Sequence, residues 1–321
     1  MTEKIFEPRV SSMYSKYPFP KRNQFGIDKM NQDFKENLNK LGLDISDFKN
    51  KKIMDAGCGT GELALFMARS GALVEGIDIS DGSLEYARRK AREARVSNIS
   101  FTKRSLYDGE FPREQYDYIV SHMVLHHTED AEKSFSTISK ALKPGGGIFI
   151  RVFFLWGRMS FFQKTTIWKV WLVQLLGGSS VERKVSLGEK LFYKEGNEIS
   201  HGLDKYTYLH DCYGIPQVTH HSFGEVLRWF NANNIEYVSS SPPMEFKKLV
   251  DQMLFNDKES ATAKGRVLKT AAKVILAILP LHKTPWAKRN GIFSRFLTQT
   301  MYAMFFGTDM FNIYGIKRKA L

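Results

Sequence analysis

The most informative segment of the sequence is Lys52-Ile53-Met54-Asp55-Ala56-Gly57-Cys58-Gly59-Thr60-Gly61. A short apolar run ends in an acidic residue and breaks into glycines at every second position, and residues 62–69 then have the pattern of an amphipathic helix. This order predicts a strand, a tight loop and a helix. Glycine permits φ > 0 and close approach of a ligand, so we expect the backbone N–H groups of residues 57–61 to be bare at the start of that helix.

The spacing of these glycines separates the loop from two common nucleotide-binding loops. A dinucleotide loop reads G-x-G-x-x-G, and a phosphate-binding loop reads G-x-x-x-x-G-K-[ST]. This loop reads G-x-G-x-G with no lysine after it. It resembles the first motif of the class I S-adenosylmethionine-dependent methyltransferases, D-x-G-x-G-x-G. The resemblance implies that the amino acid end of S-adenosylmethionine is wrapped by Asp55, Gly57, Cys58, Gly59 and Gly61. The alternative is a glycine-rich turn without a ligand.

A second acidic residue follows at the distance of one βαβ unit. Asp78 ends an apolar strand over 72–77 and lies 21 residues after Gly57. A carboxylate at this place can accept both ribose hydroxyls, and Ile79 beside it would lie on the adenine ring. After the next strand, Ser105 and Leu106 occupy the place where many such methyltransferases carry an aspartate for the adenine amino group. We expect them to contact the adenine.

Residues 116–154 carry a further resemblance. A strand over 116–121 leads to His122, His126 and His127; a helix over 129–142, a Lys-Pro-Gly-Gly-Gly turn and a strand over 148–154 follow. The unit resembles the ubiquinone and menaquinone biosynthesis methyltransferases. Related enzymes place catalytic or cofactor-lining residues here, and histidine suits a general base near neutral pH. The alternative is that the histidines shape the turn. No metal-binding pattern is present in the sequence.

The alternation of strands and helices predicts an α/β fold, a Rossmann-like, mostly parallel sheet of seven strands. Helical insertions are expected after strand five and between strands six and seven. The predicted divisions are an N-terminal arm and helix (1–50), the cofactor-binding core (51–154), a helical lid (155–220), a core helix and strand six (221–240), a second helical insertion (241–308), and strand seven with the C-terminus (309–321).

Both insertions leave the carboxyl edge of the predicted sheet, where open α/β sheets bind ligands. The first is rich in aromatic residues, among them Trp156, Trp168 and Trp171. An aromatic roof would suit an apolar substrate, although these side chains could equally form the core of the insertion itself. Other polar residues of this segment that could face the cleft are Tyr206, Tyr208, Asp211, His220 and His221.

The N-terminal residues 1–30 have no regular pattern and include Tyr14 and the run Tyr17-Pro18-Phe19-Pro20. Each proline restricts the residue before it to an extended conformation. Similar aromatic arms precede the core in some methyltransferases of this type, so Tyr14 and Tyr17 are expected to close over the cofactor. The alternative is an arm that only packs on the surface.

The composition is compatible with several kinds of binding partner and does not select one of them. The 321 residues carry a formal charge of +13, which fits a nucleic acid or a membrane surface. The two cysteines indicate a reducing compartment such as the cytoplasm, and no apolar run is long enough to span a membrane. Residues 262–279 read as an amphipathic helix flanked by Lys264, Lys269 and Lys273, which could rest on an anionic membrane or simply pack on the lid.

Three functions follow from the sequence. The first is transfer of a methyl group to an apolar or partly apolar small molecule, including a lipid-like one. The second is methylation of RNA or protein, which the basic residues would favour; against it, no RNA-binding module is recognisable. The third is a non-catalytic cofactor-binding protein, which the intact glycine loop and Asp78 disfavour.

Overall fold

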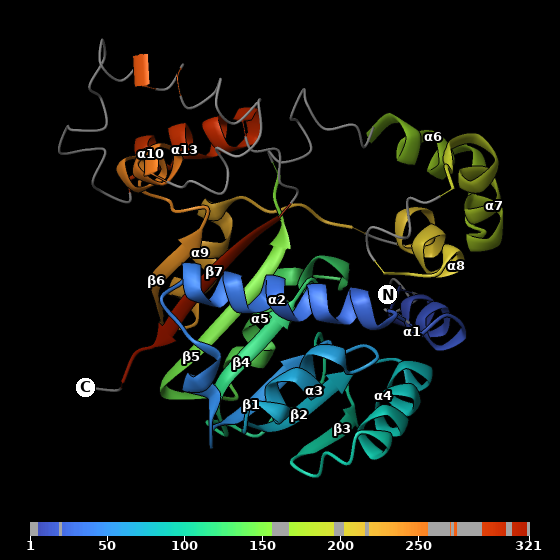
Figure 1. The fold of residues 1–321 in the computed structure, drawn as a ribbon, viewed down its shortest axis with the longest axis horizontal. Coiled ribbons are helices and arrows are strands. Elements are labelled where there is room, and N and C mark those ends of the chain that lie inside the picture. Colours follow the sequence, from blue (N-terminus) through green and yellow to red (C-terminus); the bar gives the residue numbers. More distant parts are fainter. Residues whose placement is uncertain are drawn as a thin grey trace, which may run out of the picture.

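The computed structural model describes residues 6–18, 21–155, 167–195, 202–215, 218–255, 270, 273–274, 291–305 and 310–319. At its centre is a seven-stranded sheet in the order β3-β2-β1-β4-β5-β7-β6 (Figure 1). The strands are β1 (Lys52–Ala56), β2 (Leu73–Asp78), β3 (Ile99–Lys103), β4 (Tyr116–His122), β5 (Leu142–Phe153), β6 (Ile235–Ser241) and β7 (Met310–Lys317). Only β7 runs antiparallel to its neighbours. The predicted Rossmann-like, mostly parallel sheet is confirmed.

Helices cover both faces of this sheet, because successive strand residues point to opposite sides. Ile53 packs in a cluster with Phe34 of α2 (Gln24–Lys40) and with α3 (Glu62–Arg69). Met54, the next residue, packs in the opposite cluster with α5 (Ala131–Ser139) and Trp229 of α9 (Phe223–Ala232). In Figure 1, α2 crosses in front of the sheet and α5 and α9 lie behind it. Both faces of the central strands are therefore buried, which explains their continuous apolar runs.

The turn before β5 differs from the prediction. The helix α5 ends at Ser139, and β5 already begins at Leu142, which pairs with Tyr116 across an irregular register. The Pro-Gly-Gly segment is thus a bulge within the strand rather than a stop after a longer helix. Gly145 has φ +77°, a conformation that a residue with a side chain adopts only at a cost.

The N-terminal segment is also more regular than expected. A helix, α1 (Phe6–Lys16), replaces the irregular arm, and α2 begins at Gln24 with Asn23 as its N-cap. The helix α1 packs on the start of α4 (Asp81–Glu93), where the Ser15 carbonyl approaches Gly82 so closely that a Cβ there would lie 2.4 Å from it. Tertiary packing against α4 therefore stabilises a helix that the local sequence pattern does not predict.

The insertions contain helices at both predicted places. After β5 come α6 (Ile167–Gly177), α7 (Val181–Phe192), α8 (Lys205–Leu209) and a π-helical turn, His210–Gly214. Between β6 and β7 lie α10 (Phe246–Phe255) and α13 (Ile292–Phe305). Figure 1 shows both groups beyond the end of the sheet toward which the β5 arrow points.

The first insertion has a small core of its own, formed by Val173, Val185, Leu209 and Tyr213. The side chain of Trp171 is 61% exposed, so it points to the solvent and does not contribute to a roof over the site. The side chains of Trp156 and Trp168 lie outside what the structure describes. The same holds for the predicted amphipathic helix over 262–279, apart from Thr270, Lys273 and Val274.

Candidate functional site

The glycine loop joins β1 to α3 at the point where the strand order reverses, between β1 and β4. Open α/β sheets bind their ligands at this point. Gly57 has φ +84°, and a Cβ there would lie 2.2 Å from the Val124 side chain. Gly61, the N-cap of α3, has φ +77°, and a Cβ there would lie 2.8 Å from that of Ala87. These two positions exclude any other residue on both conformational and steric grounds.

The expectation of bare amides in this loop is wrong. The N–H groups of Gly57 and Cys58 both donate to the carbonyl of Ile77, at 2.7 and 3.0 Å, and Gly61 donates to the carbonyl of Cys58 at 2.9 Å. Gly59 donates to Oδ2 of Asp78 at 2.8 Å. The tight turn folds the loop back onto the end of β2, which satisfies its amides internally. The loop therefore holds the Asp78 carboxylate through the N–H of Gly59.

Asp78 is fixed from two sides at the carboxyl end of β2. Besides the bond from Gly59, its Oδ1 accepts the N–H of Ser80 at 2.9 Å. Burial raises the pKa of the carboxyl, while the N–H donors of Ser80, Gly59 and Ile79 oppose that rise. Each carboxylate oxygen can accept more than one hydrogen bond, and the side chain remains partly exposed. The geometry leaves acceptor capacity for a pair of hydroxyl groups, as ribose binding requires.

Asp55 lies below the loop, with only 2% of its surface exposed. Its Oδ2 is buried and accepts no hydrogen bond within the described part of the chain. Burial and the nearby Asp78 carboxylate raise its pKa to about 7. A buried oxygen without a hydrogen bond is unfavourable unless another polar group donates one to it. The site therefore fits a ligand that brings a hydrogen-bond donor or a positive charge, as the amino acid end of S-adenosylmethionine does.

The expected adenine contacts lie at the ends of β2 and β3. Ile79 is partly buried, and its carbonyl accepts a hydrogen bond from the Ser11 hydroxyl at 3.1 Å. The Oγ of Ser105 accepts the N–H groups of Tyr107 and Asp108 at 3.0 and 3.2 Å, so this hydroxyl caps a turn. Leu106 is buried in the core. Ser105 thus has a structural role, and its contact with adenine stays a prediction.

The helix α1 brings Tyr14 and Tyr17 toward the end of the sheet. Burial and the carboxylates of Asp211 and Asp78 raise the pKa of Tyr14, so its hydroxyl lies within electrostatic reach of both. The ring of Tyr17 lies 3.9 Å from that of His210, centroid to centroid. The expected arm between Asp78 and the lid is therefore present, but it is the helix α1 and the residues after it rather than an irregular segment. Phe19, the third aromatic of the arm, lies outside the described residues.

The three predicted histidines differ in their surroundings. His122 ends β4, and its Nε2 accepts a hydrogen bond from the Arg151 guanidinium at 3.3 Å. Burial, Arg151 and Arg22 hold the pKa of His122 well below its usual value, so the imidazole is neutral. The ring of His126 is fully buried and packs on Phe153, with centroids 4.4 Å apart. His127 is partly buried and packs on His126. This packing favours the turn-shaping alternative for His126 and His127.

An ion pair that the sequence did not reveal stands beside the glycine loop. The guanidinium of Arg22 contacts Oε2 of Glu62 at 3.1 Å, and the N–H of Arg22 donates to Oε1 of the same residue. Both side chains are largely buried. Arg22 also forms a backbone bridge to Leu203 of the lid. The available signal was weak: an acidic residue directly after the glycine loop, and a basic residue two positions after Pro20, where the aromatic run ends.

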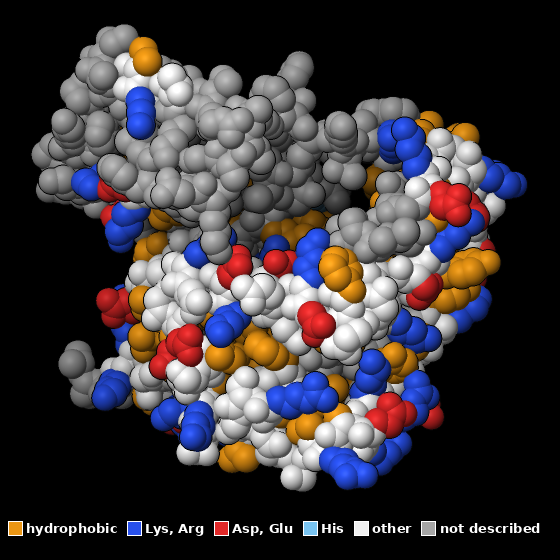
Figure 2. Space-filling model, viewed as in Figure 1, with side chains coloured by type: hydrophobic (Ala, Val, Ile, Leu, Met, Phe, Trp, Pro, Cys, Tyr) orange, Lys and Arg blue, Asp and Glu red, His pale blue; other side chains and the backbone are white. Residues whose placement is uncertain are grey.

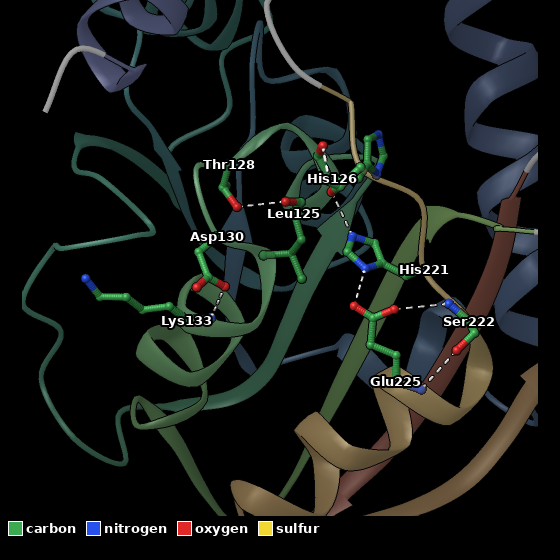
Figure 3. Close-up of polar contacts among 9 residues, drawn as sticks. Leu125, His126, Thr128, Asp130, Lys133, His221, Ser222 and Glu225 are labelled. Carbon is green, nitrogen blue, oxygen red and sulfur yellow. Dashed lines mark hydrogen bonds and ion pairs between the residues drawn. The ribbon is translucent and has the colours of Figure 1, made fainter. Parts of the chain in front are cut away.

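A second set of polar groups lies at the carboxyl end of β5 and was likewise not singled out by spacing. Figure 3 shows the His221 imidazole beside Glu225 of α9, with Nδ1 to Oε1 at 2.9 Å. The Nε2 atom lies 2.8 Å from the hydroxyl oxygen of Thr219, and the single hydrogen of that hydroxyl is donated to the carbonyl of His126 at 3.2 Å. Because a carboxylate only accepts, Nδ1 carries the proton. Glu225 also forms a capping box with Ser222, so this network joins the start of α9 to the turn that carries His126.

Comparisons with known proteins agree with this geometry. Residues 53–146 match a family model described as a methyltransferase domain. A ubiquinone biosynthesis O-methyltransferase of Shewanella sp. (strain ANA-3) is 36% identical over 113 residues, which are 35% of this chain and 48% of that protein. Phosphoethanolamine N-methyltransferase 2 of Caenorhabditis elegans is 31% identical over 166 residues, which are 47% of this chain and 38% of that protein. The chain thus spans half or less of the length of these two relatives.

A solved structure shows the same fold over most of the chain. The structure of PKMT2 from Rickettsia typhi in complex with AdoHcy aligns with a TM-score of 0.53 and 16% identity, covering 88% of this chain and 53% of that one. The strand order, the glycine loop that holds Asp78 and the matched domain lead to one conclusion. The chain contains a class I S-adenosylmethionine-dependent methyltransferase domain, which the family model matches over residues 53–146.

Proposed function

We propose that the chain transfers a methyl group from S-adenosylmethionine to a small molecule that is at least partly apolar. The proposal rests on the position of the Asp78 carboxylate, which the N–H groups of Gly59 and Ser80 hold at the carboxyl end of β2. The amino acid end of the cofactor would lie toward Asp55 and Arg22, and its ribose on Asp78. The cofactor supplies an activated methyl group, and the protein supplies position and exclusion of water.

The small-molecule acceptor is supported by the relatives and by the lid. The printed names of the relatives include ubiquinone biosynthesis O-methyltransferases and a phosphoethanolamine N-methyltransferase, which act on small molecules. Backbone contacts join the lid to the start of α2, since the N–H of Asn23 donates to the carbonyl of Gly202 at 2.8 Å; a lid held there would cover the proposed site. A covered site suits a small acceptor better than a polymer.

A nucleic acid acceptor is less favoured by the charge distribution. Among the described residues on the face shown in Figure 2, lysines and arginines lie between acidic and apolar side chains and form no continuous basic stripe. A polymer-binding enzyme needs such a stripe to track phosphates.

Calorimetry with S-adenosylhomocysteine tests the cofactor assignment. The acceptor class is tested by measuring the transfer of radiolabelled methyl groups to a lipid and small-molecule extract, and by comparing it with transfer to RNA and protein fractions. Binding of S-adenosylhomocysteine with label only in the extract is expected. Preferential binding of a nicotinamide dinucleotide would reject the cofactor assignment, and label confined to RNA or protein would reject the acceptor class.

Peripheral membrane contact has one supporting observation. The helix α6 exposes Trp171, Leu175 and Leu176, and α13 exposes Ile292, Phe293 and Phe296. Apolar side chains beside a positively charged protein are the combination that binds an anionic bilayer surface. Among the described segments, no helix has the length and apolar character needed to cross a membrane.

A further inference from the structure

A cavity of about 130 Å³ lies where α1 meets the lid. Its walls carry the aromatic rings of Tyr14 from α1, of Tyr17 directly after α1, and of Tyr206 and His210 from the lid. Asp204 and Asp211 add two carboxylates, and Lys16 and Lys21 add two ammonium groups. The charged groups and their partners decide what such a space can hold.

Three of these four charged groups are engaged elsewhere. Lys16 pairs with Glu182 at 3.0 Å, and the ammonium of Lys21 lies over the ring of Tyr86, 5.7 Å from its centroid. Asp204 is the N-cap of α8, and it accepts both the N–H and the hydroxyl of Thr207. Lys16 is therefore offset by Glu182, and Lys21 and Asp204 offset each other, since Lys21 helps to lower the pKa of the Asp204 carboxyl.

Asp211 is the exception. Its carboxylate accepts no hydrogen bond within the described part of the chain, and burial raises its pKa to about 6 against the opposing effect of Arg22. The Arg22 guanidinium is directed at Glu62, with which it forms an ion pair. Taken together, Arg22, Glu62 and Asp211 leave one negative charge without compensation. It is carried on a π-helical turn, a local distortion that is frequent at functional sites.

The cavity adjoins the cofactor site rather than a remote surface. Tyr14 lines the cavity from α1, and the same helix contacts Ile79 and Ser80, the two residues after Asp78, through the hydroxyls of Ser11 and Ser15. Arg22 connects Asp211 to Glu62, the first residue after the glycine loop. A group held by Asp211 would therefore stand beside the bound cofactor.

We infer that this cavity binds the cationic nitrogen of an amine, with Asp211 as its counter-ion and the rings of Tyr14, Tyr17 and His210 as its walls. An ammonium group gains from a carboxylate and from the faces of aromatic rings together, and the gain is larger when water is excluded. Resting on the proposed function, the inference narrows the acceptor to a molecule with an amino or methylated amino group. The cofactor's own ammonium group has the same chemistry, so the experiment must separate the two sources.

Choline is a suitable probe because its trimethylammonium group is charged at every pH, and 3,3-dimethyl-1-butanol is its neutral isostere. Binding of each to the full-length protein is measured by calorimetry, with and without saturating S-adenosylhomocysteine. We expect choline to bind at least about tenfold more tightly than the neutral alcohol. Asp211→Asn should abolish that preference and leave the affinity for S-adenosylhomocysteine unchanged. Asp33→Asn, at an exposed site on α2, is the matched control and should alter neither.

The outcomes separate the inference from the proposed function. Equal binding of choline and the alcohol, or no binding of choline at millimolar concentration while S-adenosylhomocysteine binds, would refute the amine site alone. A loss of S-adenosylhomocysteine affinity in Asp211→Asn with no effect on choline would assign Asp211 to the cofactor's ammonium group and overturn the inference. Failure of the unaltered protein to bind S-adenosylhomocysteine would instead reject the proposed function. Choline affinity should also fall as the pH drops below about 6, where Asp211 becomes protonated.

Discussion

Replacing Asp78 by Ala tests the placement of the cofactor. In the native protein its two oxygens accept the N–H groups of Gly59 and Ser80, and the proposed complex adds the ribose hydroxyls. The substitution removes both sets at once. Loss of affinity alone would therefore not prove a ribose contact, because the glycine loop would also be released.

The magnitude follows from the number and kind of these bonds. A hydrogen bond to a charged group contributes about 1.5–3 kcal/mol. Loss of the ribose contact should weaken S-adenosylhomocysteine binding by at least one such bond, which is about 10- to 150-fold in the dissociation constant. Releasing the two backbone donors should lower the free energy of unfolding by a further amount of about 1–3 kcal/mol.

A double-mutant cycle with the ligand separates the two effects. Calorimetry compares S-adenosylhomocysteine with its 2′,3′-dideoxy analogue, on the native protein and on Asp78→Ala. If Asp78 binds the ribose, the native protein should discriminate strongly between the two ligands and the variant should not. Asp81→Asn is the control, because this neighbouring carboxylate is 68% exposed and pairs with Lys103 on the surface.

One result would refute the reasoning about the ribose. If Asp78→Ala weakened both ligands by the same factor, the residue would act only by holding the loop. Unchanged affinity for both would remove Asp78 from the site altogether. The pH dependence gives a second check: the carboxylate must be ionised to accept both hydroxyls, so affinity should fall as the pH drops through its raised pKa.

Four further predictions follow from the same contacts. Removal of residues 1–18 should slow methyl transfer by up to about 10²-fold, through lost positioning and water exclusion, while calorimetric melting changes little; an equal loss of stability would make α1 purely structural. Glu225→Ala deprives the Nδ1 proton of His221 of its acceptor and should lower the free energy of unfolding in urea by about 1–3 kcal/mol, whereas Glu236→Ala, at an exposed site on β6, should have no effect. The pKa of Asp211 is raised in the native state, so its ionisation destabilises the fold as the pH rises from about 4 to 6; Asp211→Asn should therefore increase the melting temperature at pH 8 but not at pH 4, and a decrease at pH 8 would show that the carboxylate has a stabilising partner. Sedimentation with anionic vesicles should show salt-sensitive binding that Trp171→Ser weakens, and absence of binding at low salt would eliminate the membrane contact.

The order of the elements could be derived from the sequence because each signal is local. The glycines at 57, 59 and 61 fix a turn whatever surrounds it, and the apolar runs of β1 and β4 have the pattern of strands buried on both faces. Ser222 and Glu225 cap α9 as their spacing predicts. The acidic residue at 78 was identified for the same reason, since one βαβ unit fixes its distance from the loop.

What the sequence did not determine depends on contacts between distant segments. The helix α1 forms because it packs on Gly82 and Ser80, about seventy positions away, and β5 begins early because Leu142 pairs with Tyr116. The amides of the glycine loop are occupied because the loop folds back on Ile77. Arg22, Glu62 and Asp211 come together from the arm, the core and the lid, and the pKa of Asp211 depends on that burial. Desolvation and charge pairing are properties of the assembled interior, so only the tertiary structure could decide them.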